Sequence, residues 1–177
     1  MSADRMLLDA VAFAARAHEG HLRKDGKTPY VSHVFRVCLI VRDRFGFDDP
    51  RMLITALLHD TIEDTRTDFD DVEEQFGPEV ARWVAFLTKD KRLQDPEREK
   101  QYIAQFRSAP WQVQVCKLAD MFDNLTDIDV MPAERRKHSL SRAEQYFAAL
   151  RQLDAPEAQQ AIALVGALIE ETRARLR

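Results

Sequence analysis

A histidine and three carboxylates lie within one run of six residues, at His59, Asp60, Glu63 and Asp64. They follow an apolar stretch of helical spacing, and a helix that opens at Asp49-Pro50 would be near its C-terminus here. The helix dipole disfavours carboxylates at that end, and Asp60 and Asp64 form a like-charge i, i+4 pair that costs about 0.3 kcal/mol. Because a divalent cation would relieve this repulsion, the run predicts a metal site.

Two more side chains complete a set of ligands. His33 follows a loop that contains glycine and proline, and Asp120 lies in a mostly apolar run where a buried carboxylate needs a partner. Two imidazoles and two carboxylates suit manganese, iron or magnesium and leave positions open for water, whose pKa such an ion lowers. Adjacent residues of one helix point about a quarter-turn apart, so spacing alone does not bring His59 and Asp60 to one ion. The expected ligands are His33, His59, Asp60 and Asp120.

Three polar side chains lie one helical turn beyond these ligands: Glu63, Asp64 and Asn124. The two carboxylates are placed to transfer protons, with a solvated acidic helix end as the alternative. The Asn124 amide is placed to hold a ribose, a phosphate or water, with a cap or surface amide as the alternative. Arg23, Lys24 and Lys27 form a basic loop before His33, which suits phosphate but is also typical of a solvated loop.

The composition describes one soluble globular domain. The chain has 177 residues, of which 45% are hydrophobic and 32% charged, so a single domain over residues 1–177 is expected. No apolar run approaches the 18 or so residues of a membrane span, and no secretory pattern opens the chain. A net charge of −4 without a basic stripe gives no general attraction to nucleic acid. Cys38 and Cys116 lie among apolar neighbours, as in reduced core residues, and we expect a cytoplasmic protein.

Hydrophobic periodicity and helix start signals predict an all-α fold of about eight or nine helices. One helix is expected from Ser32 to about Arg44, another from Pro50 to about Glu63, and a third from Pro110 to Val130. The last of these opens with strand-like alternation, but no turn separates it from the helical pattern that follows. The apolar stripe of the final helix either completes the core or forms a homodimer contact, so the oligomeric state stays open. His18, His21 and His138 are expected at the surface or in loops.

Three segments together resemble a known family. Residues 23–33, 56–65 and 117–125, in this order and separation, resemble the hydrolase domain of RelA/SpoT-type alarmone enzymes, which belongs to the HD metallohydrolase superfamily. The resemblance covers roughly residues 5–155 and is greatest to the stand-alone small hydrolases. It implies a single-domain HD-type helical bundle that hydrolyses the 3′-pyrophosphate of ppGpp or pppGpp, releasing GDP or GTP.

The resemblance also implies roles for individual residues. A manganese ion, or another divalent metal, would be held by His33, His59, Asp60 and Asp120. Glu63 and Asp64 would be catalytic. The nucleotide would be bound by Arg23 at the guanine base, Lys24 at phosphate and Asn124, while Arg142 and Tyr146, which share one helical face, would reach the distal phosphates.

This chain departs from the family pattern in its third segment. A basic residue usually follows the aspartate and a histidine precedes the asparagine, whereas this chain has Met121 and Asp123. We therefore expect a more acidic substrate face. Two alternatives stay open: a metal-dependent phosphohydrolase of another nucleotide, such as an adenine alarmone or a dinucleotide-cofactor phosphate, and a non-catalytic helical module that binds a nucleotide or a partner protein.

Overall fold

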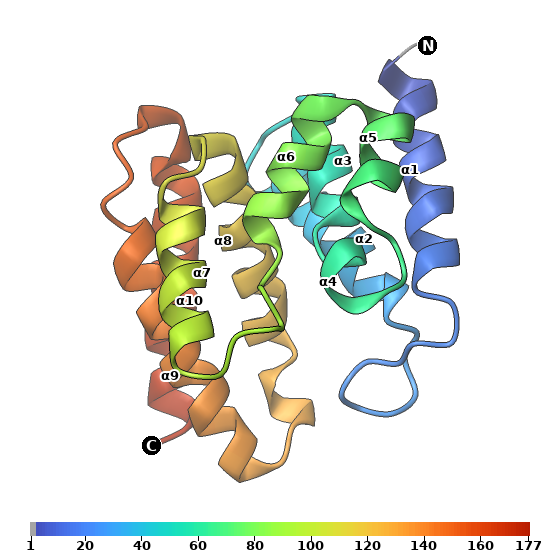
Figure 1. The fold of residues 1–177 in the computed structure, drawn as a ribbon. Coiled ribbons are helices and arrows are strands. Elements are labelled where there is room, and N and C mark those ends of the chain that lie inside the picture. Colours follow the sequence, from blue (N-terminus) through green and yellow to red (C-terminus); the bar gives the residue numbers. More distant parts are fainter. Residues whose placement is uncertain (1–2) are drawn as a thin grey trace.

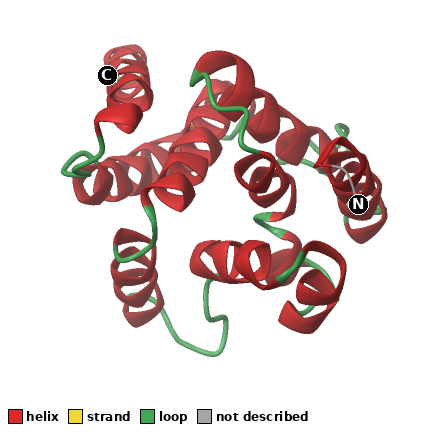
Figure 2. Ribbon diagram, turned by 90° about the horizontal axis from the view of Figure 1, so that it is seen from above, coloured by secondary structure: helices red, strands yellow, loops and turns green. Residues whose placement is uncertain are grey.

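The computed structural model describes residues 3–177 and contains helices but no strand within that range (Figure 2). Nine helices have eight residues or more, and α4 is a single turn. The first half of the chain forms α1 (Ala3–Ala17), α2 (Val31–Leu39), α3 (Pro50–Leu58), α4 (Thr61–Asp64), α5 (Phe69–Phe76) and α6 (Pro78–Leu87). The second half forms α7 (Glu97–Arg107), α8 (Trp111–Thr126), α9 (Ala133–Leu150) and α10 (Gln159–Arg175). The prediction of an all-α fold is confirmed.

Helix α8 lies at the centre of the molecule. It packs against α2, α3 and α6 from the first half of the chain and against α7, α9 and α10 from the second half (Figure 1). Eleven of its sixteen residues are buried, so the polar residues among them must find partners inside the protein. Its helical conformation agrees with the sequence prediction, although it ends at Thr126 and a 3-10 turn, Ile128–Val130, follows.

The predicted helix from Pro50 to Glu63 is interrupted, and that part of the prediction is wrong. Helix α3 ends at Leu58, and α4 begins at Thr61 after a break in which Asp60 has φ −102° and ψ −2°. The Thr61 hydroxyl donates to the Leu58 carbonyl at 2.7 Å and satisfies an acceptor that the helix end exposes. The dipole and like-charge repulsion that disfavour a helix here explain the break. Because of the break, His59 and Asp60 turn toward the same point.

The C-terminal helix α10 completes the core. It packs on α8 and α9, and Ala161, Val165 and Ile169 on it are buried. Of the two alternatives for its apolar stripe, the core contact is therefore the one that the structure contains. None of the helices in residues 3–177 combines the length and the hydropathy of a membrane span. Residues 1 and 2 of the predicted domain lie outside the described residues.

Candidate metal centre and substrate pocket

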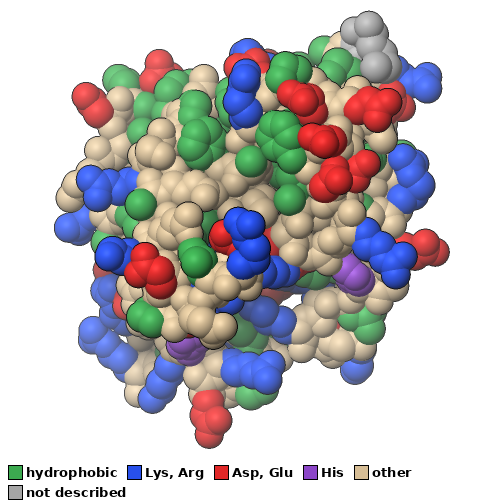
Figure 3. Space-filling model, in the orientation of Figure 1, with side chains coloured by type: hydrophobic (Ala, Val, Ile, Leu, Met, Phe, Trp, Pro, Cys, Tyr) green, Lys and Arg blue, Asp and Glu red, His purple; other side chains and the backbone are tan. Residues whose placement is uncertain are grey.

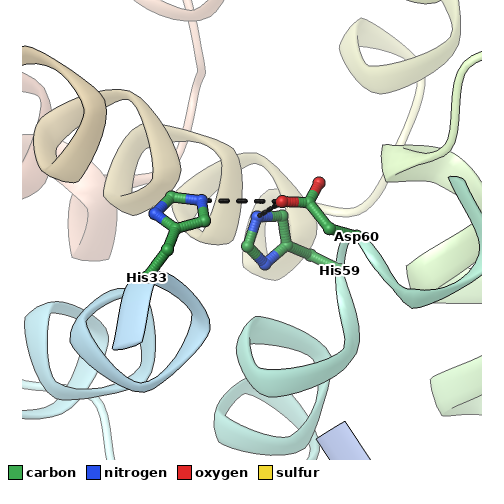
Figure 4. A group of neighbouring side chains, drawn as sticks. All are labelled: His33, His59 and Asp60. Atoms are coloured by element: carbon green, nitrogen blue, oxygen red, sulfur yellow. Dashed lines mark ion pairs between the residues drawn. The ribbon is translucent and has the colours of Figure 1, made fainter. Parts of the chain in front are cut away.

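Three predicted ligands meet between α2 and the end of α3. His33 lies in the first turn of α2, and His59 and Asp60 occupy the break between α3 and α4. Each offers one ligand atom, and these atoms all lie within 4.8 Å of one another (Figure 4). Asp60 Oδ2 is 3.0 Å from His59 Nε2 and 3.5 Å from His33 Nε2. A third contact fixes this carboxylate, because the Tyr30 hydroxyl donates to Asp60 Oδ2 at 2.5 Å.

The fourth predicted ligand, Asp120, approaches from the buried face of α8. Its Oδ1 lies 3.2 Å from His33 Nε2 and 3.7 Å from His59 Nε2. Asn124, one turn further along α8, donates to the same oxygen at 2.5 Å. The Lys117 ammonium donates to the other oxygen at 2.7 Å. The two imidazole Nε2 atoms and the two carboxylates therefore face one point from three separate parts of the chain.

The electrostatics of this cluster favour a cation at its centre. Burial opposes charge on the imidazoles, but the hydrogen bonds that His33 donates to Asp120, Asp123 and Asp60 still raise its pKa to about 9. Burial also opposes charge on Asp60, yet the neighbouring histidines hold the pKa of its carboxyl well below its ordinary value. His59 Nε2 is buried and, although close to Asp60, has no hydrogen-bond partner of acceptable geometry. A donor set of two nitrogens and two oxygens with an unsatisfied imidazole fits a divalent ion with mixed ligands.

The two carboxylates of α4 lie beside this cluster. Glu63 Oε2 accepts the Lys89 backbone N–H at 2.9 Å, and burial raises the pKa of the Glu63 carboxyl. Asp64 is more exposed and pairs with the Lys91 ammonium at 2.7 Å. Burial thus moves the pKa of the Glu63 carboxyl upward, the direction that proton transfer near neutral pH requires.

A cavity of about 300 Å³ opens over the cluster. Nine of the eleven residues predicted for the site line it: Arg23, Lys24, Asp60, Glu63, Asp64, Asp120, Asn124, Arg142 and Tyr146. The other two, His33 and His59, are buried and contact Asp60 and Asp120 behind the cavity wall. Lysine and arginine side chains gather around a recess in the lower part of the face seen in Figure 3. The cavity thus combines an acidic floor with a basic rim, as a phosphorylated ligand beside a metal requires.

Sequence reasoning missed two lysines of this cavity. Lys89 and Lys117 both line it, and both stand over the rings of Tyr102 and Tyr146. Lys117 Nζ lies 4.9 Å from the Tyr102 ring centroid and 4.8 Å from that of Tyr146. Tyr146 itself donates its hydroxyl to Glu99, which also pairs with Lys89 at 2.9 Å. One signal in the sequence was available, since Lys117 stands in an apolar run three residues before Asp120.

Replacing Lys117 by methionine is expected to destabilise the metal-free protein by about 3–5 kcal/mol, because Asp120 would keep a buried charge without its partner. Adding Mn²⁺ should recover part of this loss, since the ion would compensate the same carboxylate. Urea denaturation with and without Mn²⁺ measures both effects. Lys100→Met, at an exposed position of α7, is the matched control. Equal stability of the K117M and K100M variants would contradict the assigned pairing.

Two sequence-based interpretations need correction. His18 is not at the surface: it is 2% exposed, and burial lowers its pKa to about 4. It packs against Tyr30 with ring centroids 4.8 Å apart. Asp123 does not make the substrate face more acidic, because it is fully buried behind His33 and does not line the cavity, whereas Met121 does. Helix α8 is buried on nearly all sides, so a residue one position from the cavity face points into the interior.

Comparison with known sequences decides the family. The sequence model described as HD domain matches residues 10–170, most of the chain. The chain belongs to the HD domain family. Within this family, the human protein named guanosine-3′,5′-bis(diphosphate) 3′-pyrophosphohydrolase MESH1 is 40% identical to it over 142 residues, covering 80% of this chain and 78% of the human protein. The MESH1 of Danio rerio is 38% identical over 147 residues, covering 82% and 81% of the two chains.

Two further relatives extend the comparison of this HD domain protein. The guanosine-3′,5′-bis(diphosphate) 3′-pyrophosphohydrolase of Aquifex aeolicus is 33% identical over 145 residues, which cover 80% of this chain but 20% of that longer protein. A solved structure described as a metazoan ortholog of SpoT that hydrolyses ppGpp has a TM-score of 0.85 and 32% identity, and the match covers 94% of both chains. The helical bundle of this chain is thus an HD domain fold over nearly its whole length.

Proposed function

We propose that this chain hydrolyses the 3′-pyrophosphate of guanosine alarmones, converting ppGpp to GDP and pppGpp to GTP with release of pyrophosphate. One observation carries the proposal: four nitrogen and oxygen donors face one point on the floor of a cavity whose rim is basic. The relatives named for this activity, which align over about four-fifths of the chain, support the choice of substrate. We propose one catalytic domain, acting on a small nucleotide.

His33, His59, Asp60 and Asp120 are the residues that would hold the metal, for which we propose Mn²⁺. A divalent cation bound there would supply a water molecule of lowered pKa and neutralise charge that develops on phosphate. Attack of water on the phosphorus bonded to the ribose 3′ oxygen breaks that bond, while one proton leaves the water and the 3′ oxygen gains one. We assign these proton transfers to Glu63, assisted by Asp64, because the raised pKa of Glu63 suits a group that both accepts and returns a proton.

The basic rim positions the nucleotide. The Arg23 guanidinium is held by Asp127 at 3.2 Å and lies 5.8 Å from the Tyr30 ring centroid, so its planar face is preorganised to stack on a guanine base. We assign phosphate contacts to Lys24 and Arg142, which carry charge into the cavity from opposite ends of the chain. Asn124 and Tyr146 complete the nucleotide site. Their hydrogen bonds to Asp120 and Glu99 fix both side chains before substrate arrives.

A nucleotide panel tests this function. Purified protein with Mn²⁺ is expected to release pyrophosphate from ppGpp and pppGpp and to leave GDP and GTP, as measured by chromatography of the products. The panel includes an adenine alarmone, a dinucleotide cofactor with a ribose phosphate, and GDP and GTP as controls without a 3′-pyrophosphate. Release of orthophosphate from another member, with ppGpp unchanged, would assign the site to a different phosphorylated nucleotide.

A further inference from the structure

Asp123 contacts His33 on the side of the imidazole ring away from the other expected ligands. Its Oδ2 lies 2.6 Å from His33 Nδ1, and both side chains are buried, with Asp123 at 0% and His33 at 1% exposure. The opposite ring nitrogen, Nε2, is the one that faces Asp60 and Asp120. The imidazole therefore stands between the buried carboxylate of Asp123 and the point where the expected ligands meet.

Other charges hold the Asp123 carboxylate in this orientation. Arg36 Nε lies 2.6 Å from its Oδ1, and Arg23 Nη2 lies 3.5 Å from its Oδ2. Asp127, one turn further along the chain, shares both arginines, at 3.2 Å from Arg23 and 2.9 Å from Arg36. Asp123 is thus paired with both arginines, in addition to its contact with His33. Asp127 contacts the same arginines but makes no contact with the imidazole.

A carboxylate in this place has a specific effect on a metal-binding histidine. It accepts the Nδ1 proton, which leaves the lone pair on Nε2, and it makes the imidazole a stronger donor. Loss of such an outer partner typically weakens metal binding by about 10- to 100-fold. We propose that Asp123 is a positioning residue of the metal centre, which fixes the tautomer and ring orientation of His33. This inference rests on the proposed role of His33 as a ligand.

Asp123 stands at a position where this chain departs from the family pattern. The sequence pattern that the third segment resembles usually has a histidine here, so the departure noted in the sequence supplies a carboxylate that the pattern lacks. The structure directs this carboxylate away from the cavity and onto a ligand. Its effect is expected on metal affinity, and a direct contact with substrate is not available to it.

Metal affinity of paired variants tests the proposal. Asp123→Asn is expected to weaken Mn²⁺ binding about 10- to 100-fold, as measured by titration with detection of free Mn²⁺ by electron paramagnetic resonance. Asp127→Asn removes a partner from the same two arginines and is expected to keep the wild-type affinity. Thermal unfolding of both variants without metal establishes that each is folded. Wild-type affinity in D123N, or an equal loss in both variants, would overturn the proposal.

A spectroscopic measurement separates orientation of the ring from general structural support. With Zn²⁺ as a diamagnetic probe, the wild-type protein should show a downfield His33 Nδ1 proton, because this proton is shared with a carboxylate at short distance. D123N should lose this signal, and D127N should keep it. Persistence of the signal in D123N would contradict the assignment. Both measurements omit nucleotide, so a protein that fails to hydrolyse ppGpp but shows these differences would refute the proposed function and leave the role of Asp123 standing.

Discussion

His59→Ala is expected to abolish both stoichiometric metal binding and hydrolysis of ppGpp. Among the proposed ligands, His59 has the fewest alternative roles, because its Nε2 is buried at the meeting point of the donors and has no hydrogen-bond partner. Its Nδ1 is already used in a 2.8 Å contact with the Ala56 carbonyl, which leaves Nε2 directed at the site. Removal of one of four ligands from an ion that must also bind water should reduce turnover by about 10³-fold or more.

Metal content after dialysis and pyrophosphate release under saturating ppGpp measure the two losses. His21→Ala is the matched control, since His21 is exposed, precedes the basic loop and makes its ring contact with His18. Thermal unfolding of the metal-free proteins shows whether the His59 variant is folded. A folded H59A variant with normal metal content and normal turnover would place the metal elsewhere in the protein.

Glu63→Gln is expected to lower kcat by about 10²- to 10⁴-fold while the metal stays bound. The substitution keeps the shape of the side chain and retains an oxygen that accepts the Lys89 backbone N–H, so the structural cost is small. It removes the carboxyl whose pKa burial raises, which is the group to which we assign the proton transfers. The loss should therefore appear in kcat, with KM and metal content close to those of the wild type.

Stopped assays of pyrophosphate release, together with metal analysis of the same samples, distinguish this result from loss of the ion. Glu73→Gln, at an exposed position of α5, controls for the change of charge. If E63Q turns over at the wild-type rate, proton transfer belongs to another group, of which Asp64 is the nearest candidate on α4.

Much of the site could be predicted because most of its candidate residues lie in short segments of the sequence. The helix starts marked by Pro50 and Pro110 agree with the structure, since proline at a helix start acts locally. The eleven candidate residues came from three short segments and one helical face, and the structure places all of them at or directly behind one cavity. Their assigned roles stay predictions until variants are measured.

The features that sequence reasoning missed depend on tertiary packing. The break after Leu58 was predicted as continuous helix, because the period of apolar residues does not show where repulsion among carboxylates stops a helix. Lys117 is an ordinary surface residue by type, and its burial between two tyrosines follows from how α7 and α9 pack on α8. The direction of Asp123 likewise depends on the rotation of α8 about its axis, which composition and motif do not give.

The most direct measurement is a titration of metal-free protein with Mn²⁺ while pyrophosphate release from ppGpp is followed. Protein from which a chelator has removed the metal should be inactive. Activity should then rise to a plateau at one equivalent of Mn²⁺, because His33, His59, Asp60 and Asp120 face a single point. Full activity of the metal-free protein, or no release of pyrophosphate at any Mn²⁺ concentration, would contradict the account.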